Sequence, residues 1–576
     1  MKAARRTLPQ PAPDPRLRTI ILVGYIAAFA SLILFLWYFR HDQILLYGDA
    51  VAHINIARRV FDSCTPGLKQ LGTVWLPLPH LLIIPFIVSD WSWQTGFGAS
   101  WPFMIAYVAG VIGIFRLVRD GFTVPQPTWP VKLAPWFATA IYAANPNLLY
   151  MQATAMTESL YLAFFIWAVA FLADFARQRY SSDAALRSRA GRSLVWCGVC
   201  LALGMLTRYD GWFAAGVFCA VILVLLLRLP HSEPPSTGQA STGKSSSLRR
   251  AVIIFSLLVV VVPAFWFSYN AAIYGDALDF ARGPYSARGI EERTSKPGEA
   301  HHPGYHNLGT AATYFVKSAE LNQTEGPLEK AWIALTAAGV VLLLVYFRRL
   351  GAWLLLLIPL PFYALSIAYG GVPIFMPIWW PFSFYNVRYG LQLLPAFAVF
   401  LAVGLFWVLS RITQSRWRIA AALAAFAFVG ASYGFAWHNR PICLREAIVN
   451  SRTRVAFERN LADYLRFLPP NSTFLMYIGD HVGALQDAGI RLSRVIQEGN
   501  HGDPRIWGKE GMWQRALADP AKYADYAVGF DDDAVTKSAE AHHYPALLII
   551  HTVGQPPATI YGTHPPYPGI LPQPGR

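Results

Sequence analysis

Residues 20–39 are IILVGYIAAFASLILFLWYF, and after five residues the chain continues into LLYGDAVAHINIARRVFDSC at residues 45–64. A run of about 20 uncharged, mainly apolar residues is what an α-helix needs to cross the hydrocarbon core of a bilayer. The second stretch has a helical pattern in which Asp49 and His53 share a face and Arg58 and Arg59 continue the polar side. A span followed at once by a polar helix predicts charged side chains held at the membrane surface.

The composition is that of a membrane protein. Of the 576 residues, 55% are hydrophobic and 14% are charged, whereas soluble domains carry about 25% charged residues. The net charge of +15 arises from short basic segments between apolar blocks, as cytoplasmic loops require. No basic face of a soluble module is evident, so we predict a polytopic membrane protein without a nucleic-acid partner.

Eleven apolar blocks are long enough to be predicted as spans. A further block, LPLPHLLIIPFIV at 76–88, is shorter and contains three prolines and His80. If the N-terminus is cytoplasmic and this block does not cross, every strongly basic short loop lies inside, in agreement with the positive-inside rule. We therefore predict that 76–88 is an interfacial or re-entrant segment on the outer side. The predicted spans are residues 18–39, 101–118, 132–150, 158–176, 193–208, 211–229, 251–270, 331–347, 350–369, 387–409 and 417–437.

The tail of the chain changes character. Amphipathic helical stretches alternate there with short apolar strands near residues 473–478 and 546–553, and the end is rich in Pro and Gly. The predicted fold class is mainly α, with about 11 transmembrane helices and a small α/β domain, in a bacterial inner (plasma) membrane. The predicted parts are a cytoplasmic tail (1–17), a membrane domain (18–437) with outer loops at 40–100 and 271–330, and an extracytoplasmic α/β domain with an irregular C-terminal end (438–576).

Asp49 follows the first span and has two interpretations. As a helix cap, its carboxylate would accept hydrogen bonds from the first backbone N–H groups of the next helix. Alternatively, it acts in chemistry, because His53 lies four residues later on the same helical face. An Asp and a His placed together suit a divalent cation or a reacting hydroxyl group.

Glu158 is the only acid between Asp120 and Asp174, and it lies at the outer end of a predicted span. A carboxylate in a first helical turn can be purely structural. The predicted topology, however, places Glu158 on the same side of the membrane as Asp49. Because ionisable groups at membrane depth are expensive and commonly functional, we predict a role for Glu158 in the site.

Two Arg-Tyr pairs occur at outer ends of predicted spans. The stretch LTRYDGW, 206–212, contains Arg208, Tyr209 and Asp210, and NVRYGLQLLPA, 386–396, contains Arg388 and Tyr389. One alternative is that Arg208 and Asp210 simply pair with each other. Otherwise, a guanidinium at the outer surface is suited to bidentate binding of a lipid phosphate.

These stretches, in their order and sidedness, resemble the GT-C superfamily of integral membrane glycosyltransferases. The likeness runs through YGDAVAHINIARRV, WLPLPHLLIIPF, Glu158, LTRYDGW and NVRYGLQLLPA, and it covers about residues 15–440. The protein mannosyltransferase and aminoarabinose-transferase-like branch is most similar. Oligosaccharyltransferase relatives have a WWDYG motif, where this chain has WWPFSFY, which argues against that activity.

The resemblance implies transfer of a hexosyl or pentosyl group from a polyprenyl-phosphate donor to an extracytoplasmic glycan, lipid or protein. Asp49 matches the family's first-loop Asp, a general base or metal-associated group, and Glu158 matches the acid of the second outer loop, where many relatives have Asp. Arg208 or Arg388 would bind the lipid phosphate. A divalent metal at Asp49 and Glu158 is an open alternative, and no nucleotide cofactor is expected. The other predicted substrate-binding residues are His53, His80, Tyr209, Asp210 and Tyr389.

The competing function is a multispan transporter or flippase for a lipid-linked or anionic substrate. Transporters usually contain inverted repeats and broken helices at mid-membrane. This sequence has no evident internal repeat, and its charges gather at one face of the membrane. A structural membrane scaffold would not need Asp49, Glu158 and Arg208 on the same side. Transfer is therefore the preferred prediction.

Overall fold

The computed structural model describes most of the chain. Most of the predicted cytoplasmic tail and the irregular C-terminal end lie outside the described residues. Those described are 15–122, 128–179, 184–227, 242–283, 285–294, 298, 300–500, 511–565 and 567.

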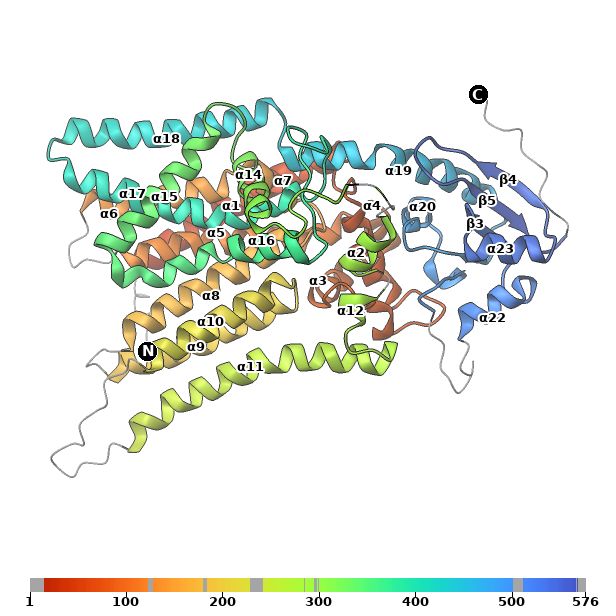
Figure 1. Ribbon diagram of the computed structural model, residues 1–576, viewed down its shortest axis with the longest axis horizontal. Coiled ribbons are helices and arrows are strands. Elements are labelled where there is room, and N and C mark those ends of the chain that lie inside the picture. Colours follow the sequence, from red (N-terminus) through yellow and green to blue (C-terminus); the bar gives the residue numbers. More distant parts are fainter. Residues whose placement is uncertain are drawn as a thin grey trace, which may run out of the picture.

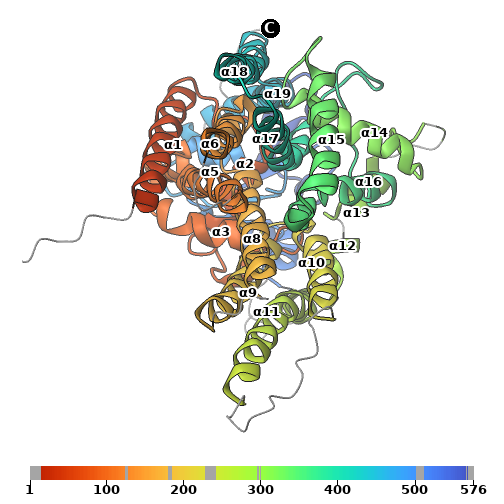
Figure 2. The ribbon, with the colours of Figure 1, turned by 90° about the vertical axis from the view of Figure 1, so that its left-hand side faces the viewer.

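The long helices form a bundle that runs along the longest axis of the molecule (Figure 1). Seen from the end of the bundle, α1 and α11 lie at its periphery, with α5 and α6 beside α1 and α8 on the inner side of α11 (Figure 2). The long helices are α1 (Pro15–Arg40), α5 (Trp101–Gly121), α6 (Trp129–Ala143), α8 (Glu158–Gln178), α9 (Ala184–Met205), α10 (Asp210–Leu227), α11 (Thr242–Tyr274), α15 (Glu329–Tyr346), α16 (Pro359–Tyr369), α17 (Leu394–Arg411) and α18 (Ser415–His438).

Nine helical segments within the described residues are long and apolar enough to cross a membrane, and each corresponds to one of the predicted spans. This confirms a helical, polytopic membrane protein, but not the count of eleven. The predicted span 132–150 is divided between α6, of 15 residues, and α7 (Pro146–Met151), and at 1.5 Å per residue α6 is shorter than a bilayer core. The predicted span 193–208 lies in α9, which contains three arginines in its first half.

Several short helices pack at one end of the bundle. The block 76–88 forms α3 and a 3-10 turn, Ile84–Phe86, which is too short to cross a bilayer. The short helices here are α2 (Gly48–Arg59), α3 (Leu78–Ile83), α4 (Asp90–Thr95), α12 (Asp279–Arg282), α13 (Ala287–Thr294) and α14 (Leu308–Leu321).

The α/β domain lies beyond this end, connected through the long helix α19 (Ile442–Phe467), which leads from the bundle toward the sheet (Figure 1). The described residues form one sheet in the order β2-β1-β3-β5-β4, in which β1 is parallel to both neighbours and β5 is antiparallel to both of its own. Both predicted strands are present, as β1 and β4. The elements are β1 (Phe474–Met476), α20 (Val482–Ala488), β2 (Val495–Ile496), α22 (Met512–Ala518), β3 (Tyr526–Phe530), α23 (Ala534–Ala541), β4 (Ala546–Ile550) and β5 (Ala558–Gly562).

Gly339 sets how closely α15 approaches α17. A Cβ added at Gly339 would lie 2.1 Å from the backbone carbonyl oxygen of Phe400, so Gly339→Ala must push the helices apart. We expect it to lower the free energy of unfolding by about 1–3 kcal/mol. Gly404→Ala on α17 is the matched control, because nothing lies within 4 Å of its added Cβ. Thermal unfolding in detergent compares the two, and equal melting temperatures would contradict the expectation.

Candidate active site

Asp49 is the second residue of α2 and does not cap it. The N-cap position is Tyr47, without a side-chain cap bond, and the N–H groups of Ala50 and Val51 bond to the carbonyl of Tyr47. The carboxylate of Asp49 instead accepts a hydrogen bond from Arg388 Nη2 at 2.6 Å. The cap interpretation is therefore wrong. The Asp49 side chain is 41% exposed, whereas that of Arg388 is 9% exposed. Solvent therefore reaches the pair from the side of Asp49.

Arg388 connects three carboxylates from three helices. It lies in a 3-10 segment, Val387–Leu393, that leads into α17. Besides Asp49, its guanidinium meets Glu446 Oε1 through Nη1 and Glu158 Oε1 through Nε, both at 3.3 Å. The backbone N–H of Arg388 also donates to Glu446 Oε2 at 3.3 Å. Glu158 and Glu446 are buried, at 0% and 1% exposure, so this arginine compensates charges that water does not reach.

Arg208 forms the second half of the network. Its Nε donates to both carboxylate oxygens of Asp210, at 3.0 and 3.1 Å, as the pairing alternative required. Its other nitrogens donate to the hydroxyl groups of Thr157, at 3.1 Å, and Tyr363, at 3.0 Å, and to Glu158 Oε1 at 3.4 Å. Each guanidinium nitrogen of Arg208 thus already has a protein partner. Glu158 lies between the two arginines and joins the halves.

Tyr389 separates the two guanidinium groups. The centre of its ring lies 5.1 Å from Cζ of Arg208 and 5.1 Å from Cζ of Arg388, and the ring of Tyr47 lies 5.2 Å from Arg388. Aromatic faces attract cations electrostatically at such distances. The rings therefore hold two like charges close together inside the protein.

The network contains more carboxylates than guanidinium groups. It combines Asp49, Glu158, Asp210 and Glu446 with only two arginines. Within the described residues, no group of three or more His, Cys, Asp or Glu side chains is arranged to hold a metal ion. Because the Arg388 guanidinium contacts both Asp49 and Glu158, these two do not form a ligand pair as placed. The predicted metal role does not fit this arrangement.

Tyr209 is not part of the network. Its hydroxyl donates to the carbonyl of Val74 at 2.9 Å and accepts from Trp266 Nε1 at 3.2 Å. Its ring stacks on Phe280, with centroids 5.3 Å apart. Tyr209 therefore packs the loop around Val74 against α11, and the predicted substrate-binding role is not supported by its position.

His53 and His80 form a pair of their own. His53 Nδ1 and His80 Nε2 lie 2.8 Å apart, and the His53 ring packs against Trp75 at 4.6 Å. Both rings are buried, at 5% and 0% exposure. A hydrogen bond between two imidazole rings needs one donor and one acceptor, so the pair requires at least one neutral ring.

This pair predicts a loss of stability in acid. Burial lowers the pKa of His53 to about 4 and holds the pKa of His80 well below its usual value, whereas an unfolded chain titrates near 6.5. The unfolded state then binds more protons between these values. The free energy of unfolding should fall from pH 6.5 toward 4, by at most about 1.4 kcal/mol per pH unit per histidine.

Thermal melts across this pH window check the expectation. His53→Gln removes one of the two titrating groups, so its melting temperature should fall less steeply with acidification than that of the wild type. Parallel curves for the two proteins would contradict it.

Comparison with solved structures identifies proteins that have a similar fold. The crystal structure of ArnT from Cupriavidus metallidurans bound to undecaprenyl phosphate is similar with a TM-score of 0.54 and 12% identity, covering 96% of this chain and 99% of that one. Its apo state gives a TM-score of 0.55 at 12% identity, over 95% and 97%. The fold is the GT-C fold.

A further solved structure is less similar, and the sequence comparisons found no match. The Archaeoglobus fulgidus oligosaccharyltransferase tethered with an acceptor peptide has a TM-score of 0.47 and 15% identity, over 94% of this chain and 74% of that one. No protein-family model and no curated protein sequence matches the chain.

Sequence reasoning missed three residues that this GT-C fold brings to the site. Glu446 comes from α19, in a stretch that the sequence assigns to the outer domain, and Tyr363 lies inside a predicted span. Tyr47 lies two residues before Asp49. One signal was available for Glu446: it is an acid shortly after the last predicted span, in the same kind of position as Asp49 after the first.

Proposed function

We propose that this protein is a GT-C-type membrane glycosyltransferase that moves a sugar from a polyprenyl-phosphate donor to a hydroxyl group of a glycan, lipid or protein. The observation that carries the proposal is the exposed carboxylate of Asp49, held at 2.6 Å by a buried arginine just beyond the first span. The similar ArnT crystal structure contains undecaprenyl phosphate, which supports a lipid-phosphate donor.

Asp49 is suited to act as the general base. In an inverting transfer, the acceptor O–H gives its proton to an Asp49 oxygen while the acceptor oxygen bonds to the anomeric carbon of the sugar. The bond between that carbon and the phosphate oxygen breaks, and its electron pair leaves with the lipid phosphate. A base within hydrogen-bond reach of the hydroxyl group is the first requirement, and Asp49 is the exposed acid of the network.

Arg388 is the better candidate for the leaving phosphate. Its Nη2 atom contacts Asp49, whose side chain is 41% exposed, whereas the partners of the Arg208 nitrogens are all buried. A phosphate oxygen that shares Nη2 would relieve Asp49 of its ion pair as the donor binds. One cation would then serve both the base and the charge that develops on the phosphate.

The proposed sidedness follows the positive-inside argument. The N-terminus would be cytoplasmic, and Asp49, Glu158 and the α/β domain would face the extracytoplasmic side of a bacterial inner membrane. Single cysteines introduced at Asp276 and Asp532, which lie in an outer loop and in the α/β domain, should react with membrane-impermeant maleimide in intact spheroplasts. Protection of both positions would reverse the assignment.

The direct test is transfer in membranes that contain the wild-type protein. Radiolabelled polyprenyl-phosphate pentoses and hexoses are offered singly, and label in glycan, lipid and protein fractions is measured against membranes without the protein. We expect one donor to label one fraction. Release of no label from any donor would contradict the proposal and favour transport of a lipid-linked substrate.

A further inference from the structure

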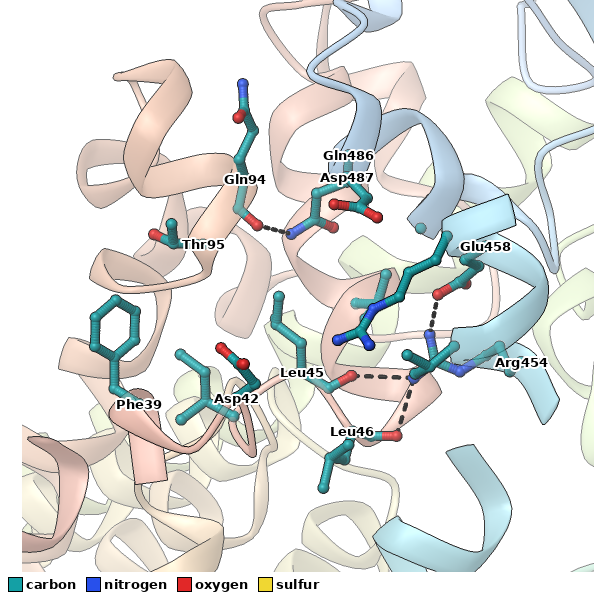
Figure 3. Close-up of a pocket in the computed structure, with 15 residues that line it drawn as sticks. Phe39, Asp42, Leu45, Leu46, Gln94, Thr95, Arg454, Glu458, Gln486 and Asp487 are labelled. Atoms are coloured by element: carbon teal, nitrogen blue, oxygen red, sulfur yellow. Dashed lines mark hydrogen bonds and ion pairs between the residues drawn. The ribbon is translucent and has the colours of Figure 1, made fainter. Parts of the chain in front are cut away.

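A cavity of about 310 Å³ lies next to the candidate active site without belonging to it. It is enclosed by the end of α1, the loop into α2, and the helices α4, α19 and α20 (Figure 3). Val51 lines it, and Val51 lies two residues beyond Asp49, roughly 200° around the helix. Helix α2 therefore separates this cavity from the arginine and carboxylate network.

Most charged groups that line the cavity are already paired. Arg454 holds Glu458 at 2.6 Å and donates to the carbonyl oxygens of Leu45 and Leu46 at 3.0 Å (Figure 3). Asp487 pairs with Arg466 at 2.9 Å. These contacts fix the walls of the cavity.

Two lining charges of opposite sign have no such partner. Asp42 and Arg459 make no ion pair and no side-chain hydrogen bond with the described residues. In Figure 3 the carboxylate of Asp42 lies between Phe39 and Leu45, directed toward the cavity. A ligand that carries both a phosphate and an amine would complement this pair of charges.

The cavity lies at the level of the membrane surface. It begins where the apolar helix α1 ends, at Arg40, and the exposed side chains Trp37 and Trp91 lie on the adjoining elements, at 57% and 56% exposure. Tryptophan is enriched where hydrocarbon meets the headgroups. The cavity is therefore placed where lipid headgroups lie.

An apolar path leads from the cavity along α1. Phe39 lines the cavity, and Leu32, Phe29 and Tyr25 continue its helical face at spacings of three, four and seven residues. These three side chains are 48%, 67% and 72% exposed, and α1 lies at the periphery of the bundle (Figure 2). Acyl chains can follow this face.

We propose that the cavity binds the headgroup of an amine-bearing zwitterionic phospholipid of the surrounding membrane. Arg459 receives the phosphate, Asp42 receives the ammonium group, and the acyl chains lie along α1. The bound lipid rests against the loop of Leu45 and Leu46 that Arg454 holds, and this loop leads directly into Asp49. Phosphatidylethanolamine is the probe with this chemistry.

Native mass spectrometry of the full-length protein tests the assignment. The protein is reconstituted with equal amounts of phosphatidylethanolamine and phosphatidylglycerol, and retained lipid is counted. We expect retention of phosphatidylethanolamine by the wild type, weakened about tenfold by Arg459→Gln and by Asp42→Asn, since each removes one charge-assisted contact. Arg452→Gln is the matched control, because Arg452 is exposed on the same helix and does not line the cavity.

The other outcomes overturn the proposal in recognisable ways. Equal retention of phosphatidylglycerol, lost only with Arg459→Gln, would identify a site for phosphate alone. Retention unchanged by both variants would place the lipid elsewhere. Displacement of phosphatidylethanolamine by a soluble acceptor sugar would make the cavity a glycan subsite. None of these readings depends on transfer activity, so a failure of the proposed function leaves the result interpretable.

Discussion

Asp49→Asn is expected to lower the rate of sugar transfer by about 10²–10⁴-fold, the usual contribution of a general base. The amide has nearly the shape of the carboxylate but cannot accept the proton of the acceptor hydroxyl. The Asp49–Arg388 pair is partly exposed on the Asp49 side, and such pairs contribute about 0–1 kcal/mol to stability. The melting temperature should therefore change little, although the rate of sugar transfer falls strongly.

Initial rates from vesicles with matched protein content check this expectation. Asp276→Asn is the control, because Asp276 forms its ion pair with the exposed Arg282, neither of which belongs to the network, and should leave the rate unchanged. If the lower rate comes from a higher KM for the acceptor while kcat is unchanged, Asp49 acts in binding and not in the chemical step. An unchanged rate would remove Asp49 from the chemistry.

Arg388→Met is expected to lower the free energy of unfolding by about 3–5 kcal/mol, the cost of breaking a buried ion pair by removing one partner. The substitution leaves the buried Glu446 without its cation and leaves the buried Glu158 with Arg208 alone. It also removes the group that we assign to the leaving phosphate, so activity should be lost as well. Thermal unfolding in detergent, with transfer measured on the same preparation, gives both values.

A second substitution separates the two effects. Combining Arg388→Met with Glu446→Gln removes the buried negative charge of Glu446. This double variant should recover part of the lost stability, but no activity. Glu446→Gln alone keeps an acceptor for the Arg388 backbone N–H and should retain most activity. A single variant Arg388→Met as stable as the wild type would show that the carboxylates do not depend on this cation.

Much of the architecture was accessible from the sequence because bilayer crossing imposes a one-dimensional requirement. An uninterrupted apolar run is visible residue by residue, and nine of the eleven predicted spans have counterparts in long apolar helices. The two exceptions show the limit of this reasoning. The block 132–150 is interrupted, because α6 ends at Ala143 and a new helix begins at Pro146, and α9 carries its arginines within the helix.

The site could be predicted only in part, because its contacts join residues that are far apart in the sequence. Asp49, Glu158 and Arg388 are each visible as isolated charges near the ends of apolar runs, so the pattern of residues shows which groups are costly to place there. It did not determine their partners. Glu446 meets Arg388 across 58 residues of chain, and Asp49 meets it across 339.

The partners of these charges depend on how the helices pack. Pairing depends on distances of a few ångströms between helices that are remote in sequence, and Coulomb attraction and desolvation change steeply over such distances. The same packing turned Tyr209 away from the network and Tyr389 into it, although both follow an arginine in the chain. Each ionised side chain is costly to bury, and the packing of the helices determines which opposite charge offsets that cost.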